Sequence, residues 1–304
     1  MSKIAVVFPG QGSQFVGMGQ TLYDQSEYAR SLFKQASDIM RADIAKICLE
    51  GPEETLKQTQ YAQMGLFLVS AALYHSLAQT GLKPDYLAGH SLGELTAYYV
   101  SGVVNLEQAI RMVMIRGQYM QEAVAPIEGA MAAVLGLDMQ AIQATIQAVG
   151  NQNIVVANDN CPGQVIISGL KEALEQIQEP LKQAGAKRVL PLNVAGPFHS
   201  PFMQAASNRY QTYLRSEIFQ DAQIPLVLNR TAQVETKAAI LKENLPLQIV
   251  SPVRWRETVE WLSAEVETFI ECGPGSVLSG LIKKTNQDVS IQTINSIELV
   301  KERI

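Results

Sequence analysis

The first part of the chain alternates short apolar runs with longer segments of helical periodicity. Residues 3–8 (KIAVVF) are apolar almost throughout and lead into the glycine-rich PGQGSQ, which is typical of a strand buried in a parallel sheet. Residues 63–81 predict a buried or strongly amphipathic helix that ends at Gly81, and Pro84 prevents its continuation. A short strand before Ser91, a helix after it and a second apolar helix, LEQAIRMVMIRGQYMQEA, follow. This order predicts an α/β fold.

After Pro126 the elements become shorter. The pattern predicts, in order, a strand at GAMAAVLGL, a helix at DMQAIQATIQAVG, strands at NIVVAN and QVIISG, a helix at LKEALEQIQEPLKQAG and a strand at AKRVLPLNV. The order β-α-β-β-α-β is that of a ferredoxin-like unit. We therefore predict a small domain over residues 126–198, inserted in a large domain formed by residues 1–125 and 199–304. In the second part of the large domain we expect strands at IPLVLN and TFIECG and helices at WRETVEWLSA and VLSGLIKK.

Composition narrows the class of protein. A chain of 304 residues, 47% of them hydrophobic, can bury one large core or two moderate ones. The formal net charge of −5 disfavours general binding to nucleic acid or to an anionic membrane. The three cysteines lack CxxC spacing, so neither a disulfide framework nor a metal site is predicted. Because the sequence shows no secretory signal and no apolar run long enough to span a bilayer, we expect a cytoplasmic protein.

The pentapeptide GHSLG, residues 89–93, lies at a predicted strand-to-helix corner. In a G-x-S-x-G elbow the serine occupies a strained turn, and small residues flank it because the backbone passes close to neighbouring elements. The pentapeptide alone is a weak signal, but its position after a strand and before a helix is the context expected of a nucleophile. We therefore predict that Ser91 is a nucleophile rather than a structural turn serine.

A serine nucleophile needs a base to accept its proton. Of the three histidines, His75 lies within an apolar helix, and His90 adjoins Ser91, where we expect it to pack or orient. His199, in AGPFHSPFM, lies in an irregular loop after the last predicted strand of the small domain. The order of serine before histidine also matches that of the α/β-hydrolases. His199 is therefore the predicted base.

The acidic partner of this histidine is not evident. Asp138 and Asp159 fall within the predicted small domain, and neither follows a recognisable strand end. A carbonyl oxygen can orient an imidazole instead of a carboxylate. A catalytic dyad and a triad therefore both stay open.

Two backbone N–H groups are candidates for an oxyanion hole. Leu92, directly after the predicted nucleophile, supplies one, and Gln11, at the centre of PGQGSQ, supplies the other. The alternative for this glycine-rich loop is dinucleotide binding. That fingerprint fails at its third glycine, where Phe15 stands, so no nucleotide cofactor is predicted.

Arg116 is the remaining candidate. It ends the run RMVMIR in a largely apolar helix, so its guanidinium is expected to be partly buried and to need a partner. A structural ion pair, a surface position or a substrate carboxylate bound in a bidentate fork each satisfies this expectation. The sequence leaves these alternatives open.

Taken together, a set of motifs resembles one enzyme family. In chain order they are FPGQGSQFVGMG, GHSLGE, RGQYMQEA, GAMAAVLG, NCPGQVIISG, GPFHSPFM, SPVRW and ECGPGSVLSGL. They run from residue 4 to about residue 284 and resemble the bacterial malonyl-CoA:acyl-carrier-protein transacylases of fatty-acid synthesis. The resemblance implies an α/β-hydrolase-like large domain with a parallel sheet and a ferredoxin-like insertion. It agrees with the order of elements predicted above.

The resemblance also implies a role for each candidate residue. Ser91 is the nucleophile that becomes malonylated, and His199 is its general base and later its general acid. Gln11 and Leu92 match the backbone donors of the oxyanion hole. Arg116 matches the arginine that binds the free carboxylate of the malonyl group.

Two glutamines complete the implied site. Gln248 matches the residue whose main-chain carbonyl orients the histidine, and Gln63 matches a residue near the acyl pocket. The family usually has Gln-Pro where this chain has Gln63 and Met64, and Leu95 replaces a common tyrosine after the elbow. Neither change falls on an implied reacting group.

The implied activity is ping-pong transfer of a malonyl group from malonyl-CoA to the pantetheine thiol of an acyl carrier protein, by a monomer without a cofactor. Discrete polyketide transacylases share these motifs, so the pathway of the carrier stays open. Two alternatives are a hydrolase and a non-catalytic subunit that binds the carrier. Five basic residues are candidate carrier contacts, with an ordinary solvated surface as the alternative: Lys182, Lys187, Arg188, Lys283 and Lys284.

Overall fold

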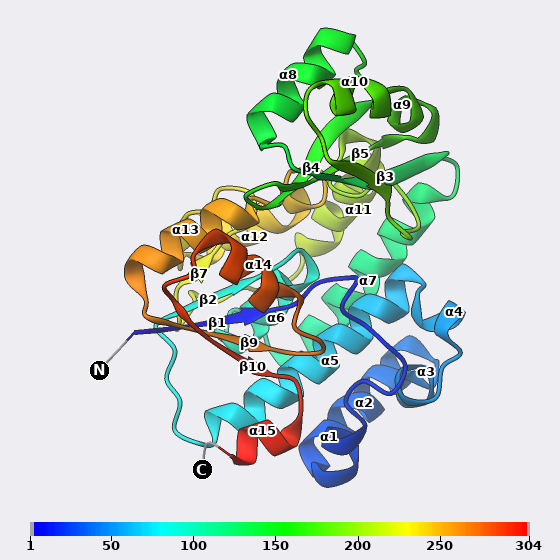
Figure 1. The fold of residues 1–304 in the computed structure, drawn as a ribbon. Helices are drawn as coiled ribbons and strands as arrows, with labels where there is room; N and C mark the ends of the chain where they lie inside the picture. Colours follow the sequence, from blue (N-terminus) through cyan, green and yellow to red (C-terminus); the bar gives the residue numbers. More distant parts are fainter. Residues whose placement is uncertain (1–2, 303–304) are drawn as a thin grey trace.

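The computed structural model describes residues 3–302, which form a large six-stranded sheet and a small four-stranded sheet (Figure 1). The strand order of the large sheet is β10-β9-β1-β2-β7-β8, and all neighbours are parallel except β7 and β8. Its strands are β1 (Ile4–Phe8), β2 (Tyr86–Gly89), β7 (Leu226–Val227), β8 (Val234–Glu235), β9 (Thr268–Cys272) and β10 (Ser290–Ile294). The predicted parallel sheet is confirmed, although IPLVLN contributes only two residues to it.

Helices cover both faces of the large sheet because successive side chains of its strands point to opposite sides. In β1, Val6 and Phe8 pack against α5 (Thr59–Ala78), α6 (Leu92–Val100) and α7 (Leu106–Val124). Ala5 and Val7 pack against α13 (Trp255–Glu265) and α14 (Val277–Thr285). The remaining helices outside the small sheet are α1 (Gln20–Gln25), α2 (Glu27–Met40), α3 (Ile44–Leu49), α4 (Glu53–Leu56), η1 (Pro201–Met203), α11 (Gln204–Leu214), α12 (Ala238–Gln248) and α15 (Ile297–Lys301).

The small sheet is antiparallel, with the order β4-β5-β3-β6 expected of a ferredoxin-like unit. Its elements are β3 (Gly129–Leu135), α8 (Met139–Val149), β4 (Ile154–Cys161), β5 (Gln164–Leu170), α9 (Lys171–Gln176), α10 (Gln178–Gln183) and β6 (Arg188–Pro191). The predicted fold class is therefore confirmed. The domain boundaries at residues 125/126 and 198/199 stay a prediction.

Two elements of the small sheet differ from the sequence prediction. The single helix predicted over LKEALEQIQEPLKQAG is divided at Ile177, because Pro180 has no N–H to donate to the carbonyl of Gln176. The strand predicted over AKRVLPLNV is limited to residues 188–191. It pairs only with β3, at the edge of the sheet, and the N–H of Leu192 still donates to the carbonyl of Met131 at 2.9 Å beyond it. A tight turn, in which the N–H of Val194 donates to the carbonyl of Leu192 at 3.0 Å, then takes the chain out of the strand.

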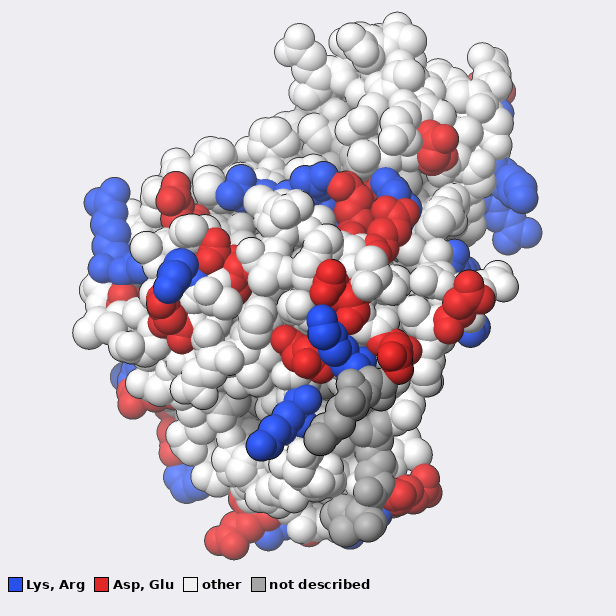
Figure 2. Space-filling view, turned by 90° about the vertical axis from the view of Figure 1, so that its left-hand side faces the viewer, with Lys and Arg blue, Asp and Glu red and all other residues white. Residues whose placement is uncertain are grey.

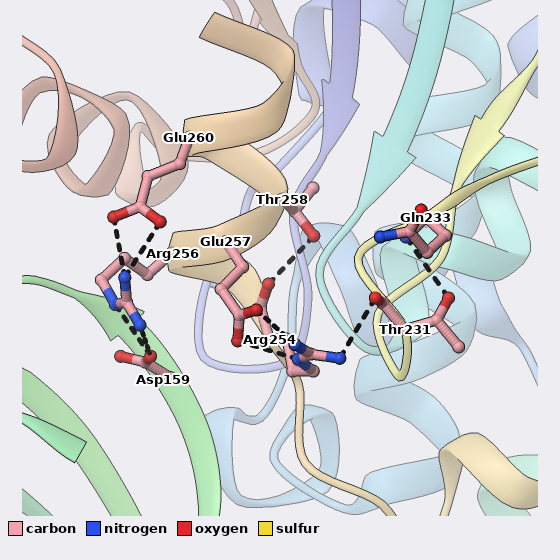
Figure 3. Close-up of polar contacts among 8 residues, drawn as sticks. All are labelled: Asp159, Thr231, Gln233, Arg254, Arg256, Glu257, Thr258 and Glu260. Carbon is pink, nitrogen blue, oxygen red and sulfur yellow. Dashed lines mark hydrogen bonds and ion pairs between the residues drawn. The ribbon is translucent and has the colours of Figure 1, made fainter. Parts of the chain in front are cut away.

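An ion-pair network connects the small sheet to α13 (Figure 3). Arg256 binds Asp159 of β4 at 2.9 Å and Glu260 at 2.7 Å. Beside it, the N–H of Asp159 donates to the carbonyl of Val253 at 2.9 Å, and Val253 donates to Ala157 at 2.8 Å. The segment that precedes α13 is therefore fixed to the edge of β4.

Charged side chains are unevenly distributed on one face of the molecule. On the face shown in Figure 2, acidic and basic side chains are interspersed over the lower part, whereas the upper part carries few charges. The sequence contains no charged residue between Asp138 and Asp159. None of the helices within residues 3–302 is long and apolar enough to cross a membrane.

Candidate active site

The candidate site lies where neighbouring parallel strands of the large sheet end. β1 leads into the loop that contains Gln11, β2 leads into Ser91, and β7 is followed by Asn229. His199 lies in the segment that follows β6. Residues of the small sheet line the same cavity as His199, so this sheet also borders the site. The carboxyl ends of parallel strands are a common ligand-binding position in α/β sheets.

The Ser91 elbow has the strained geometry predicted from GHSLG. Ser91 adopts φ 51° and ψ −103°, directly before α6. A Cβ atom on Gly89 would lie 1.9 Å from the carbonyl carbon of Gly93, and one on Gly93 would lie 2.0 Å from the carbonyl oxygen of Phe8. Glycine is therefore required on both sides of the serine, because the corner packs directly against backbone.

His199 lies in hydrogen-bonding contact with the serine. Its Nε2 is 2.8 Å from Ser91 Oγ, and its Nδ1 lies 3.0 Å from the carbonyl of Gln248 and 3.1 Å from that of Ser251. Because both partners of Nδ1 are acceptors, Nδ1 carries the proton and Nε2 is left to accept the serine hydroxyl. The geometry is that of a nucleophile and a base, with carbonyl oxygens in the orienting position.

The two aspartates considered for a triad have other partners. Asp138 caps α8 by accepting the N–H of Ala141 at 2.7 Å, and Asp159 binds Arg256. Of the alternatives left open by the sequence, the geometry therefore favours a dyad oriented by carbonyl groups.

The environment keeps His199 neutral. Burial is the largest cause that lowers the pKa of His199 to about 3, and the positive charge of Arg116 is the next. Its side chain is therefore an acceptor at neutral pH. His90 packs edge-on against Trp255 and contacts Asn160 at 2.9 Å, as expected of a packing residue.

Arg116 is fully buried beside the serine. Its Nη1 donates to Gln63 Oε1 at 2.7 Å, and its Nη2 donates to Gln248 Oε1 at 2.9 Å and to Ser91 Oγ at 3.1 Å. Its Nε has no hydrogen-bond partner among the described residues. Burial lowers the pKa of Arg116 to about 10, so the guanidinium stays charged at neutral pH. A buried cation bound by two neutral amides and a hydroxyl is suited to an incoming carboxylate.

Gln248 joins the base, the cation and the elbow. Its backbone carbonyl accepts the N–H of His199, and its side-chain oxygen accepts from Arg116. Its side-chain Nε2 donates to the carbonyl of Ser91 at 3.0 Å. Both the oxygen and the nitrogen of this side chain therefore have a partner within the site.

The candidate oxyanion donors lie on the expected elements. Leu92 is the first residue of α6, and N–H groups in a first helical turn have no acceptor within the helix. Gln11 lines the same cavity as Ser91 and His199, and this cavity has a volume of about 90 Å³. Their backbone N–H groups stay predicted donors. The rest of the cavity is mostly apolar, with lining residues that include Met120, Met131, Leu192, Val194 and Phe198.

A second cavity, of about 290 Å³, leads on from the first. The two share five lining residues: Gln11, His90, Asn158, Leu192 and Val194. The larger one also borders α14 at Val277 and Leu278. A narrow, extended part of a ligand could therefore reach the serine through the space between α14 and the small sheet.

Gln63 lies in the site, while the unusual residue beside it does not contact the reacting groups. Gln63 is buried and binds Arg116 and the sulfur of Met120, the latter at 3.5 Å. Met64 is buried among the apolar side chains of the core.

Two buried residues were not found from the sequence. Asn229 contacts the backbone of the Ser91 elbow, and Glu94 contacts Asn229. A signal was present for each, since Asn229 is the polar end of the apolar run IPLVLN and Glu94 is an acid in an otherwise apolar helix. Their partners lie more than a hundred residues apart in the sequence, so the contacts could not be inferred.

Comparison with known proteins agrees with this geometry. The acyl transferase domain family matches residues 5–302. The malonyl CoA-acyl carrier protein transacylase of Bacillus subtilis (strain 168) is 43% identical over 304 residues, which cover 99% of this chain and 96% of that protein. The protein of the same name from Staphylococcus aureus (strain MRSA252) is 40% identical, with 99% and 98% covered.

Solved structures extend the agreement to three dimensions. An acyl carrier protein S-malonyltransferase from Vibrio cholerae has a TM-score of 0.95 and 40% identity, with 99% of each chain covered. A malonyl-transacylase in complex with a type II polyketide synthase acyl-carrier protein has a TM-score of 0.95 and 38% identity, with 99% of each chain covered. The fold and the site thus define an acyltransferase. The chain belongs to the malonyl CoA-acyl carrier protein transacylase family, which confirms the resemblance of its motifs.

Proposed function

We propose that Ser91 carries a malonyl group from malonyl-CoA to the pantetheine thiol of an acyl carrier protein, a transfer that supplies fatty-acid chain elongation. The observation that carries this proposal is the buried guanidinium of Arg116, 3.1 Å from the serine oxygen. A hydrolase of neutral esters has no use for a buried cation at this position. An acyl group that ends in a carboxylate matches both its charge and its fork of donors.

The first half-reaction forms a covalent intermediate. Ser91 Oγ attacks the thioester carbonyl carbon while His199 Nε2 takes the hydroxyl proton, across the observed 2.8 Å contact. The backbone N–H groups of Leu92 and Gln11 stabilise the oxyanion. The carbon–sulfur bond then breaks, His199 returns the proton to the departing CoA thiolate, and the malonyl group remains on Ser91 as an ester.

The second half-reaction reverses these steps with a different thiol. The pantetheine thiol gives its proton to His199 and attacks the malonyl ester, and the proton finally returns to Ser91 Oγ. The carbonyl groups of Gln248 and Ser251 keep Nδ1 protonated throughout. Because the acyl group rests on the enzyme between two substrates, the kinetics are ping-pong.

The malonyl carboxylate also prepares the base. The charge of Arg116 lowers the pKa of His199 in the free protein. A bound carboxylate offsets that charge and draws the guanidinium toward itself, so His199 becomes more basic as the correct substrate binds. Gln63 and Gln248 orient the guanidinium for this contact.

The larger cavity is the proposed channel for the pantetheine arm of CoA and of the carrier. It borders α14, which carries Lys283 and Lys284, and Lys284 contacts Gln164 at its rim. These two lysines, with Lys187 and Arg188, are the basic residues we propose for contact with an acidic carrier. The enzyme is proposed to act as a monomer in the cytoplasm.

Intact-protein mass spectrometry tests the proposal. Wild type and Ser91→Ala are exposed briefly to malonyl-CoA, and a pantetheinylated carrier protein is then added. The expected result is a malonyl adduct on wild type only, which moves to the carrier. An adduct lost to water but never to the carrier would favour a hydrolase, and no adduct with any acyl-CoA would favour a non-catalytic subunit.

A further inference from the structure

The side chain of Asn229 spans the nucleophile elbow. Its Oδ1 accepts the backbone N–H of Ser91 at 2.7 Å, and its Nδ2 donates to the carbonyl of Gly89 at 2.6 Å. Asn229 is fully buried, so water does not compete for these contacts. One carboxamide therefore binds the peptide groups on both sides of His90.

The carboxamide of Asn229 continues the hydrogen bonding between β2 and β7 beyond the last pair of the ladder. β2 and β7 pair through Leu87 with Leu226 and through Ala88 with Val227, and the chain then turns away at the elbow. The side chain of Asn229 supplies the donor and the acceptor that the next residues of a regular strand would have supplied. Its orientation is unambiguous, because a flipped amide would set donor against donor and acceptor against acceptor.

Glu94 fixes Asn229 in turn. The backbone N–H of Asn229 donates to Glu94 Oε2 at 2.6 Å, and Asn244 Nδ2 donates to Glu94 Oε1 at 2.8 Å. Glu94 is fully buried and belongs to α6, the helix that starts directly after Ser91. The elbow, Asn229 and Glu94 thus form a closed ring of contacts.

These contacts determine which groups of Ser91 remain available. Its N–H is bound by Asn229 and its carbonyl by Gln248, so neither backbone group can swing into the cavity. The hydroxyl is left pointing at His199, and the next N–H, that of Leu92, is left for the oxyanion. A strained φ and ψ persist only where the surroundings enforce them.

We propose that Asn229 is a positioning residue for the nucleophile and that Glu94 holds it in place. The inference rests on the proposed function, because it assigns a task to residues behind the reacting serine. Neither residue touches the substrate. Both act by keeping Ser91 Oγ at its attacking position relative to His199 and to the oxyanion donors.

Two near-isosteric variants test the hydrogen bonds by which Asn229 and Glu94 hold the Ser91 elbow, which we call the clamp. Asn229→Asp keeps an acceptor for Ser91 but replaces the donor to Gly89 with a second acceptor, which repels that carbonyl. Glu94→Gln keeps the shape but sets an amide N–H against the donors of Asn229 or Asn244. If Asn229→Asp fails to fold, Glu94→Gln still tests the same ring.

Three quantities are measured for each variant. The first is the rate of Ser91 modification by a neutral fluorophosphonate, followed by intact mass. The second is kcat and KM for malonyl transfer, and the third is the dissociation constant of malonyl-CoA on a Ser91→Ala background. We expect both reaction rates to fall by the same factor, on the order of 10- to 100-fold for Asn229→Asp and less for Glu94→Gln, with KM and the dissociation constant within about twofold.

A matched control separates positioning from loss of stability. Leu22→Ala removes a buried side chain in α1, a helix that borders neither cavity. The proposal is overturned if Asn229→Asp and Glu94→Gln react at wild-type rates, if only KM changes, or if Leu22→Ala with an equal loss of Tm slows the reaction equally.

The fluorophosphonate also distinguishes this proposal from the proposed function. If wild type reacts with the probe but forms no malonyl adduct, the malonyl transfer fails while the probe rates still decide for or against the clamp. If wild type reacts with neither reagent, Ser91 is not a nucleophile and both proposals fall.

Discussion

The Ser91 corner and the His199 loop each place a non-glycine residue at positive φ, 51° and 54°, but they are restrained differently. At the corner, two glycines within two residues of the serine allow the backbone to pass. In the loop, Gly196 packs closely against Val124 and Ser200 Oγ donates to the carbonyl of Pro197. The imidazole of His199, however, is oriented by carbonyl groups 49 and 52 residues further along the chain. Glycines beside the serine thus make its strained turn possible, whereas the orientation of the base depends on backbone groups from a distant part of the chain.

Removal of the base is expected to have the largest effect. In His199→Ala the corner stays intact but has no acceptor for its proton, so we expect kcat/KM for malonyl transfer to fall by about 10⁴-fold or more. A steady-state transfer assay measures this, with Ser91→Ala and the double variant as controls. If the double variant falls well below both single variants, the two residues do not act as one unit.

Removing the cation separates recognition from chemistry. In Arg116→Ala the corner and the loop keep their backbone contacts, but the malonyl carboxylate loses its partner. We expect a loss of about 2 to 5 kcal/mol in transition-state binding of malonyl groups, with acetyl transfer unchanged or faster. The measurement is kcat/KM for malonyl-CoA and acetyl-CoA, with Arg116→Lys as the matched variant that keeps the charge but loses the fork. Equal rates for both donors in wild type and Arg116→Ala would exclude this role.

Gln248→Ala removes a side chain but leaves the backbone carbonyl that orients His199. The contacts to Arg116 and to the carbonyl of Ser91 are lost. We expect kcat to fall about 10- to 100-fold, since one of the lost hydrogen bonds involves a charged group. The matched control is Gln147→Ala, an exposed glutamine on α8 that should match wild type. A loss as large as that of His199→Ala would mean that the carbonyl had moved as well.

The smallest expected effect is on the pH dependence of stability. The pKa of His199 is about 3 in the folded protein against an ordinary 6.5, so the unfolded chain binds a proton first as the pH falls. Below pH 6.5 this residue therefore lowers the free energy of unfolding, by about 1.4 kcal/mol per pH unit. In urea titrations between pH 5 and 8, the free energy of unfolding of His199→Gln should therefore fall less steeply with decreasing pH than that of wild type.

Two other buried titratable groups are present in both wild type and His199→Gln. They therefore do not contribute to the difference between the two pH profiles of unfolding free energy. His90 acts in the same direction as His199, because burial also lowers its pKa. Glu94 acts in the opposite direction, because burial raises its pKa to about 7. Parallel curves for wild type and His199→Gln would contradict the assignment of a depressed pKa to His199.

The sequence predicted what depends on neighbours along the chain. The buried strand before PGQGSQ, the corner at GHSLG and the order of elements in the small sheet each follow from local pattern. A prediction failed where one residue overrode the periodicity, as Pro180 does in dividing a helix. Hydrophobic patterning records burial, but it does not count the available N–H donors.

The same limit applies to the site. Ser91, His199 and Arg116 were found because their residue types are chemically conspicuous in their context. The role of Gln248 was inferred only from the family resemblance. Every residue has a backbone carbonyl, so the residue type does not indicate which carbonyl orients the histidine. Asn229 and Glu94 were not found because their contacts join elements distant in sequence.

Gln248 has a consequence for how this enzyme can change specificity. Its side chain accepts a hydrogen bond from Arg116, the proposed binding group for the acyl carboxylate, and its main-chain carbonyl orients His199, the proposed base. Substrate choice and proton transfer are therefore not independent traits in this architecture. A lineage that exchanges Arg116 for a neutral residue, to accept uncharged acyl groups, must find a new partner for Gln248 or tolerate a slower catalyst.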